Sequence, residues 1–307
     1  MFTIQDIRGV FPAMVTPIRE DGSVDTGAVA PLVEYFIQAG VSGLYVCGTT
    51  GETPLLTRER KEAMLGAVCE AVAGRLPVMV HVGTLPMEEC LAFAKRAQEL
   101  GARFLSAIPP YYFPFGSREM LNYYRALLDV MEADCALFLY NIPAFARNSI
   151  PVEVVRALCE DRRFAGIKDS EGNIQLTQSY LEVLEAPRRV FIGSDDLIER
   201  AFTLGAAGSI SGNANVLPEL FVRLYRAKRN GRDDVAVRCQ ELVNQLAEAT
   251  HYGNIPLLKA GLAWRGVPVG RALPPFDAAA QRADADYLTD TIAQIQAQLR
   301  QMPEFPA

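Results

Sequence analysis

Lys168 stands where a lysine can do covalent chemistry, at the end of the short apolar run 164–167. The chain has only five lysines beside 25 arginines, so arginine supplies most of its positive charge. A desolvated lysine can lose its proton and attack a carbonyl carbon as a free amine, whereas an arginine stays protonated. We therefore predict that Lys168 forms a Schiff base. The other lysines lie in helical patterns, Lys61, Lys95 and Lys228 among charged residues and Lys259 in an apolar segment.

A threonine turn follows another apolar run. Gly48 and Gly51 let the backbone approach a ligand closely, so the N–H groups and hydroxyls of Thr49 and Thr50 would form a nest for a carboxylate. Turns of glycine and threonine are also common in ordinary loops. The turn alone therefore leaves both interpretations open.

Two further residues at the ends of apolar runs have side chains suited to proton transfer or binding. Tyr140 would shuttle a proton, and because a free phenol holds its proton tightly at neutral pH it needs polar neighbours such as Thr50 and Tyr112. Asp195, with Asp196 beside it, would bind substrate hydroxyls. Amphipathic packing is the alternative for Tyr140, and helix capping is the alternative for Asp195.

Strand-like and helix-like segments alternate along most of the chain, which indicates parallel strands joined by helices. The strand segments are nearly continuous apolar runs, as expected where both faces of a sheet are buried. Strands are predicted at 10–15, 43–47, 78–82, 104–108, 136–140, 165–168, 190–192 and 208–211, with helices between them, for example at 29–39, 58–72, 88–100, 118–131 and 177–184.

Eight such units predict an α/β fold of the closed (β/α)8 or TIM barrel class, since these barrels need eight repeats and about 250 residues. The sequence after residue 211 is helical, with segments at 217–229, 233–249, 255–264 and 283–299. We therefore divide the chain into 1–212, with the barrel strands and the catalytic mouth, and 213–307, with the last barrel helix and a C-terminal helical extension packed on the barrel. Active sites of such barrels lie at the carboxyl ends of the strands, so the candidate residues would share one mouth.

Composition argues against several classes of partner. The net charge is −6, the sequence pI is near 5.2, and no long basic run is present, so nucleic acid is not expected as a partner. No apolar stretch approaches the ~20 residues needed to cross a bilayer. Residues 1–6 lack the basic start and apolar core of a signal peptide. We expect a cytoplasmic protein with no membrane partner.

Neither the cysteines nor the histidines predict a metal site. The six cysteines form no Cys-x-x-Cys pair, and several lie in apolar patterns, which favours reduced core residues. The two histidines, His81 and His251, are far apart in the sequence, so a zinc site made of imidazoles is not expected. His81 ends an apolar run, where it would line a pocket or have a structural role.

Together these segments resemble the dihydrodipicolinate synthase/N-acetylneuraminate lyase family of class I, pyruvate-handling enzymes. The similarity runs from about residue 9 to residue 276 and includes the spacing between Tyr140 and Lys168. The motifs that carry it are Gly48-Thr49-Thr50-Gly51-Glu52, Tyr140-Asn141-Ile142-Pro143, Gly166-Ile167-Lys168-Asp169 and the segment 205–211, which includes Ile210 and Ser211.

The resemblance implies a TIM barrel with a helical C-terminal extension, usually a homotetramer, and no metal or organic cofactor. It implies that Lys168 forms the Schiff base with pyruvate or another 2-oxo acid, that Thr49 and Thr50 hold the carboxylate, and that Tyr140 is the general acid and base. Tyr112 matches a tyrosine that such enzymes lend to the proton relay of a neighbouring subunit. Further substrate contacts are expected from Gly48, Asp195, Ile210 and Ser211.

One position separates this chain from the synthase branch of the resemblance. Five residues after the relay tyrosine, that branch carries an arginine for the carboxylate of aspartate semialdehyde, and this chain has Phe145. An apolar ring cannot replace a bidentate guanidinium, although Arg147 in the same loop is a candidate to compensate. The segment Lys168-Asp169-Ser170 is also similar to branches that act on 2-keto-3-deoxy sugar acids or 4-hydroxy-2-oxoglutarate. We expect a class I lyase that cleaves such an acid, with the synthase and a 2-keto-3-deoxy acid dehydratase as alternatives.

Two other protein classes share the predicted architecture. A metal-dependent barrel aldolase would need histidine and carboxylate ligands, which two distant histidines do not supply. A noncatalytic binding protein is the second alternative, because a fold does not determine a function. Chelation of divalent ions tests the first alternative, and borohydride reduction in the presence of pyruvate tests the second.

Overall fold

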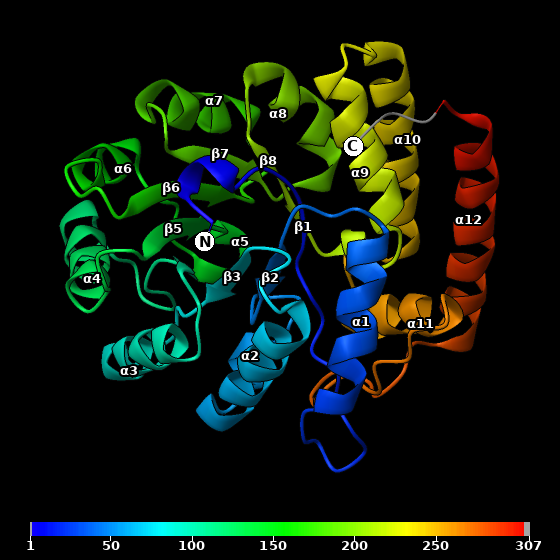
Figure 1. Cartoon of the computed structure of the whole chain (residues 1–307), viewed down its shortest axis with the longest axis horizontal. Helices are drawn as coiled ribbons and strands as arrows, with labels where there is room; N and C mark the ends of the chain where they lie inside the picture. The colour runs from blue at the N-terminus through cyan, green and yellow to red at the C-terminus, as the bar shows by residue number, and fades with distance from the viewer. Residues whose placement is uncertain (1, 304–307) are drawn as a thin grey trace.

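In the computed structural model, which describes residues 2–303, eight parallel strands form a closed barrel (Figure 1). The hydrogen-bonded order is β1-β8-β7-β6-β5-β4-β3-β2, and a parallel bridge between Ala13 and Tyr45 closes the ring between β1 and β2. The predicted TIM barrel is confirmed. The strands are β1 Gly9–Pro12, β2 Leu44–Val46, β3 Val78–His81, β4 Phe104–Ala107, β5 Ala136–Asn141, β6 Phe164–Asp169, β7 Arg189–Ile192 and β8 Gly208–Ser211.

Helices alternate with the strands and cover the outside of the barrel. The helix that follows β2 begins as the sequence suggests, since the hydroxyl of Thr57 accepts a hydrogen bond from the N–H of Arg60. Two of the barrel helices have only seven residues, too few to show a clear 3.6-residue period. The helices are α1 Thr26–Gln38, α2 Arg58–Val72, α3 Met87–Glu99, α4 Ser117–Asp129, α5 Pro143–Ala146, α6 Val152–Leu158, α7 Ile174–Val183, α8 Ile198–Leu204 and α9 Pro218–Arg229, with 3₁₀ turns η1 Ile4–Asp6, η2 Thr53–Leu55, η3 Asp195–Leu197 and η4 Asn213–Asn215.

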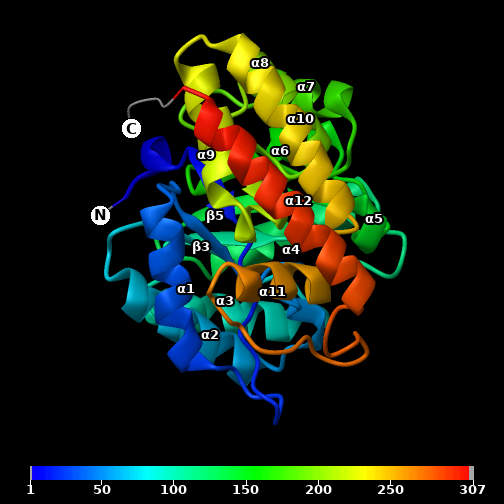
Figure 2. The same ribbon diagram turned by 90° about the vertical axis from the view of Figure 1, so that its right-hand side faces the viewer.

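Three more helices form the C-terminal extension. They are α10 Asp233–Ala249, α11 Ile255–Trp264 and α12 Arg282–Gln301, at the right of Figure 1. Helix α12 packs against both α10 and α11, and Figure 2 shows it crossing this side of the molecule. Helix α9 packs against β1 and also against α10, so the extension continues the helical layer of the barrel.

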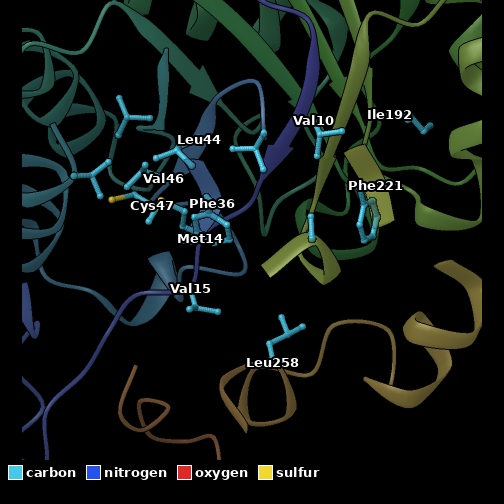
Figure 3. Close-up of a cluster of buried hydrophobic side chains, with 14 of the residues drawn as sticks. Val10, Met14, Val15, Phe36, Leu44, Val46, Cys47, Ile192, Phe221 and Leu258 are labelled. Carbon is cyan, nitrogen blue, oxygen red and sulfur yellow. The ribbon is translucent and has the colours of Figure 1, made fainter. Parts of the chain in front are cut away.

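The apolar core has two layers. The larger lies between the strands and the helices, and Figure 3 shows part of it, with Val46 of β2, Phe221 of α9 and Leu258 of α11. The smaller fills the barrel, where Phe191 makes edge-to-face contacts with Phe11 and Phe138 at centroid distances of 5.3 and 6.0 Å. These three phenylalanines fill the barrel interior below the mouth.

All six cysteines are free thiols. Four of them are buried, as expected of reduced core residues, while Cys69 and Cys159 are half-buried. Within residues 2–303, no helix combines the length and the apolar character that a bilayer-spanning segment needs.

Candidate active site

Lys168 and Tyr140 face the barrel interior from neighbouring strands. They are paired in the register of β5 and β6, so they lie at the same level of the barrel. The register shifts between Leu137 and Phe138, which gives β6 one extra residue. Gly166 is required at this bulge, because its φ is 142° and a Cβ atom there would lie 1.8 Å from the carbonyl oxygen of Arg189.

The Lys168 amine lies among aromatic faces. Its Nζ is 3.9 Å from the ring centroid of Tyr140 and 4.6 Å from that of Tyr45, and the residue is only 4% exposed. Gly193 makes room for this side chain, since a Cβ atom there would lie 2.9 Å from the Lys168 Cε. Within residues 2–303 the amine has neither a hydrogen-bond acceptor nor an ion-pair partner. The Lys168 amine is therefore available to contact a ligand.

Two other lysines are buried but differ from Lys168. Lys259 on α11 is held by oxygens of Glu52, Thr16 and Arg271. Lys61 lies among charged residues in the sequence of α2, yet it is buried outside the barrel wall, 5.9 Å from the ring centroid of Phe93. Burial lowers the pKa of Lys61. Among these three lysines, Lys168 alone lies on a strand and faces the barrel interior.

The Tyr140 phenol meets a threonine hydroxyl. Its oxygen lies 3.3 Å from Oγ1 of Thr49, within hydrogen-bond distance. The sequence had suggested Thr50 as its polar neighbour, whereas Thr50 lies against Gly212, where a Cβ atom would come within 2.9 Å of the Thr50 hydroxyl. The two threonines of the turn therefore face different neighbours.

The turn at 48–52 also leaves backbone donors available. The N–H of Glu52 donates to the carbonyl of Thr49 at 3.0 Å, and the N–H of Thr53 donates to that of Gly48 at 3.3 Å. In the described chain, the N–H groups of Thr49, Thr50 and Gly51 have no acceptor. Three free N–H groups beside two hydroxyls suit a carboxylate, as the glycine-flanked sequence suggests.

Two residues beneath the turn were not assigned a catalytic or binding role from the sequence. Tyr45 contacts the Tyr140 ring edge-on at 6.0 Å and donates from its hydroxyl to the Ser106 hydroxyl at 3.2 Å. Gly48 is required here, because a Cβ atom would lie 2.4 Å from the Tyr45 ring. His81 contacts Tyr140 edge-on at 5.9 Å, and its Nε2 accepts from the Ile108 N–H. Burial, with smaller contributions from two lysines, lowers the pKa of His81 to about 3, so its imidazole is neutral.

Asp195 lies at the end of β7 beside the end of β8. Its Oδ2 accepts from the Ser211 hydroxyl and from the Asn213 amide, both at 2.8 Å, while its Oδ1 is shielded from solvent and has no partner in the described chain. Burial raises the pKa of Asp195 to about 6, against the opposing effects of these hydrogen bonds and of Lys168. The carboxylate caps no helix, since the cap of η3 is Ser194 without a side-chain bond. Ile210, between Ser209 and Ser211, is buried in the barrel interior.

Three predicted residues are exposed in the segments that follow the carboxyl ends of β4 and β5. Tyr112 is 71% exposed, has a left-handed φ of 75° and contacts only the ring of its neighbour Phe113 among aromatic side chains of residues 2–303. Phe145 is 68% exposed on α5, and Arg147 ends that helix with a φ of 62°. Asn148 joins the two loops, because its amide donates to the carbonyls of Pro110 and Phe113, both at 2.8 Å.

The potential metal ligands that lie together in the described chain are Glu132, Asp134 and Cys135. They belong to the loop that leads into β5, at the opposite end of the barrel from Lys168. They do not contribute to the mouth.

The sequence model of the dihydrodipicolinate synthetase family matches residues 6–295 of the chain. The chain belongs to this family. The predicted membership is confirmed, and with it the predicted enzyme class, an aldolase or lyase.

Relatives within the dihydrodipicolinate synthetase family differ in activity by name. N-acetylneuraminate lyase of Rhizobium meliloti is 32% identical over 94% of this chain and 95% of its own length. The 4-hydroxy-tetrahydrodipicolinate synthase of Methanosphaerula palustris is also 32% identical, over 88% of this chain and 93% of its own. Sequence identity therefore does not separate the lyase from the synthase branch of the family.

Solved structures share the family fold along the whole chain. A catalytic-lysine mutant of the sialic acid aldolase of Ruminococcus gnavus superposes with a TM-score of 0.93 over 99% of this chain and 100% of its own, at 24% identity. YagE of E. coli K12, a member of the dihydrodipicolinic acid synthase family solved with pyruvate, gives a TM-score of 0.89 over 94% and 99%, at 26% identity.

Proposed function

We propose that this family member cleaves a 2-keto-3-deoxy sugar acid or 4-hydroxy-2-oxoglutarate through a Schiff base on Lys168. The observation that carries the proposal is the environment of the Lys168 amine, buried and without a partner, 3.9 Å from the Tyr140 ring. A lysine amine is a nucleophile that forms Schiff bases with carbonyl substrates. The free N–H groups at Thr49 and Thr50 supply a place for the carboxylate next to that carbonyl.

The reaction follows from the flow of charge. The Lys168 Nζ adds to the C2 carbonyl carbon, and loss of water leaves a protonated imine that draws electrons from C3. Tyr140, paired with the Thr49 hydroxyl, gives its proton to the hydroxyl that leaves as water and then takes the proton of the C4 hydroxyl. The C3–C4 bond breaks and an aldehyde departs. The electron pair of the broken bond stays with C3 and turns the imine into an enamine. Protonation at C3 and addition of water then release pyruvate and the free lysine.

The groups at the mouth favour a hydroxylated substrate. The unpartnered Asp195 Oδ1 and the nearby Ser211 and Asn213 can bind hydroxyls of a sugar chain. Phe145 offers an apolar ring where a second carboxylate would need a bidentate cation. Arg147, exposed on the same loop, keeps condensation of pyruvate with aspartate semialdehyde as an alternative. A dehydratase, which expels a hydroxyl group from the same imine, is the other alternative.

We also propose that the working enzyme is a homotetramer in which Tyr112 reaches a neighbouring subunit. Two observations on Tyr112 support this proposal: the side chain is exposed, and the residue has a strained φ of 75°. A strained backbone persists only where surrounding contacts hold it, and a neighbouring subunit would supply such contacts. Light scattering measures the assembly. If a monomeric protein were fully active, both the tetramer and this role for Tyr112 would be wrong.

One substrate panel tests the proposed function. We expect pyruvate and borohydride to give a stable covalent adduct, and cleavage of 2-keto-3-deoxy sugar acids or 4-hydroxy-2-oxoglutarate to be faster than condensation of pyruvate with aspartate semialdehyde. Phe145→Arg is expected to improve that condensation. Efficient condensation by the unaltered chain would overturn the choice of branch, and the absence of any adduct would overturn the Schiff-base mechanism itself.

A further inference from the structure

A buried ion pair joins the threonine turn to the C-terminal extension. The Lys259 Nζ on α11 lies 2.7 Å from Oε1 of Glu52, the last residue of the turn, and both side chains are almost completely buried. Glu52 has a left-handed φ of 63°, which a residue other than glycine adopts rarely. The pair therefore holds an unusual backbone conformation next to Thr49 and Thr50.

The remaining contacts of the two charges come from two other chain segments. The Lys259 ammonium also donates to the carbonyl of Thr16, at 2.8 Å, and to that of Arg271. The Glu52 Oε2 accepts from the N–H of Leu273 at 2.6 Å. The loop after β1, the threonine turn and the segment before α12 thus meet at one point.

Thr16 adds a second hold on the same turn. Its buried hydroxyl donates to the carbonyl of Gly51 at 2.7 Å, while its own carbonyl accepts from Lys259. We call Thr16, Glu52 and Lys259 the clamp. Through the Glu52 N–H, which donates to the carbonyl of Thr49 at 3.0 Å, the clamp is one hydrogen bond from the residue that meets Tyr140.

Stability alone does not explain such a clamp. Replacing a buried ion pair with apolar residues of similar volume is often neutral or stabilising, because both charges lose their hydration on burial. Burial lowers the pKa of Lys259, and Glu52 opposes that change. What a buried ion pair anchored by hydrogen bonds to Thr16, Arg271 and Leu273 provides is one fixed geometry.

We propose that the clamp positions the proton relay: it fixes the turn at 48–52 so that the Thr49 hydroxyl stays within hydrogen-bond distance of Tyr140. Glu52, Lys259 and Thr16 are positioning residues, since they act through Thr49 and do not touch the Lys168 amine. The inference rests on the proposed function of Lys168 and Tyr140. It makes the C-terminal extension part of the catalytic apparatus.

The test uses the full-length protein and the double variant Glu52→Gln/Lys259→Met, which removes both charges with little change in volume. Trapping of pyruvate by borohydride should match the unaltered protein, because Lys168 is untouched. The kcat for aldol cleavage should fall by 10-fold to about 10²-fold, the scale of a small misplacement of catalytic groups. The matched control is Glu199→Gln/Lys228→Met, another Lys–Glu pair, at 2.9 Å, between α8 and α9. The control should keep its kcat.

A double-mutant cycle distinguishes positioning from a purely structural role. If the clamp acts through the relay, Tyr140→Phe should lower kcat by a much smaller factor in the clamp variant than in the unaltered protein. Effects that multiply independently, or a kcat equal to that of the control pair, would overturn the proposal. If thermal unfolding shows that the double variant is not folded, Thr16→Val carries the same predictions, because it leaves both charges in place.

Failure of the inference is separable from failure of the proposed function. An unaltered protein that traps no pyruvate overturns both. An unaltered protein that traps pyruvate and turns over, with clamp variants indistinguishable from the control pair, overturns only the role of the clamp.

Discussion

Tyr140 and Lys168 occupy paired positions on β5 and β6, and the Lys168 Nζ lies 3.9 Å from the centre of the Tyr140 ring. The pairing places the amine and the phenol at one level of the barrel, next to the threonine turn that follows β2. A carbonyl carbon bonded to this amine would therefore lie close to the Tyr140 side chain. The geometry supports covalent attachment and proton transfer within one small space.

Lys168→Ala should abolish the borohydride-trapped adduct with pyruvate, because the remaining buried lysines are either held by oxygens or lie outside the barrel wall. Intact mass spectrometry after reduction measures the adduct. The control is Lys95→Ala, which removes an exposed lysine on α3 and should leave trapping unchanged. An adduct of normal yield in Lys168→Ala would place the nucleophile elsewhere.

Tyr140→Phe should keep the adduct and slow turnover by about 10²–10⁴-fold, the usual effect of losing a general acid or base. Steady-state rates of aldehyde release measure the loss. Tyr124→Phe is the matched control, since it removes a buried phenol hydroxyl on the outer helix α4, 3.5 Å from the carbonyl of Ala107. Normal turnover by Tyr140→Phe would contradict the relay.

The two threonines of the turn should behave differently. Thr49→Val removes the hydroxyl next to Tyr140 and should lower kcat about fivefold, the value of one ordinary hydrogen bond. Thr50→Val should mainly raise the KM for the 2-oxo acid, because its hydroxyl is assigned to the carboxylate. Kinetics of both variants on one substrate decide the matter, and a larger effect on kcat from Thr50→Val would reverse the assignment.

Sequence patterns predicted the parts of the site that depend on strand ends. Apolar runs identified β5 and β6, and since barrel chemistry lies at the carboxyl ends of strands, Tyr140 and Lys168 were expected at one mouth. The relatives and the closed eight-stranded barrel confirm the family and the fold. Local patterns sufficed here because each residue stands directly on a regular element.

Contacts between distant segments could not be predicted in the same way. Thr49, and not Thr50, is the hydrogen-bond neighbour of Tyr140. Which of two adjacent threonines faces Tyr140 depends on the backbone conformation of the turn, and local sequence patterns do not predict it. Lys61 has charged neighbours along the sequence of α2, yet its own side chain is buried. The pairing of Lys259 with Glu52 joins α11 to the end of β2, and its one sequence signal was a lysine in an apolar helix.

Asp195 should make stability depend on pH in a defined direction. Burial raises its pKa in the folded protein to about 6, above the ordinary aspartate value of 3.8. The folded state therefore binds the Asp195 proton more tightly than the unfolded state does. The resulting stabilisation is complete below the pKa of the unfolded state, 3.8, and is lost as the pH rises through the pKa of the folded state, about 6. Each pH unit between the two is worth ~1.4 kcal/mol, so the loss between pH 5 and pH 7 is about 1 kcal/mol.

Asp195→Asn removes the titrating group and keeps an oxygen to accept from Ser211 and Asn213. The free energy of unfolding is measured with urea at several pH values. Relative to the unaltered protein, that of the variant should increase by about 1 kcal/mol between pH 5 and pH 7, and the difference should stay constant above pH 7. Asp277→Asn, an exposed control, should follow the unaltered protein throughout. A constant difference between Asp195→Asn and the unaltered protein across this range would show that Asp195 is already ionised at pH 5, and that burial does not raise its pKa as far as expected.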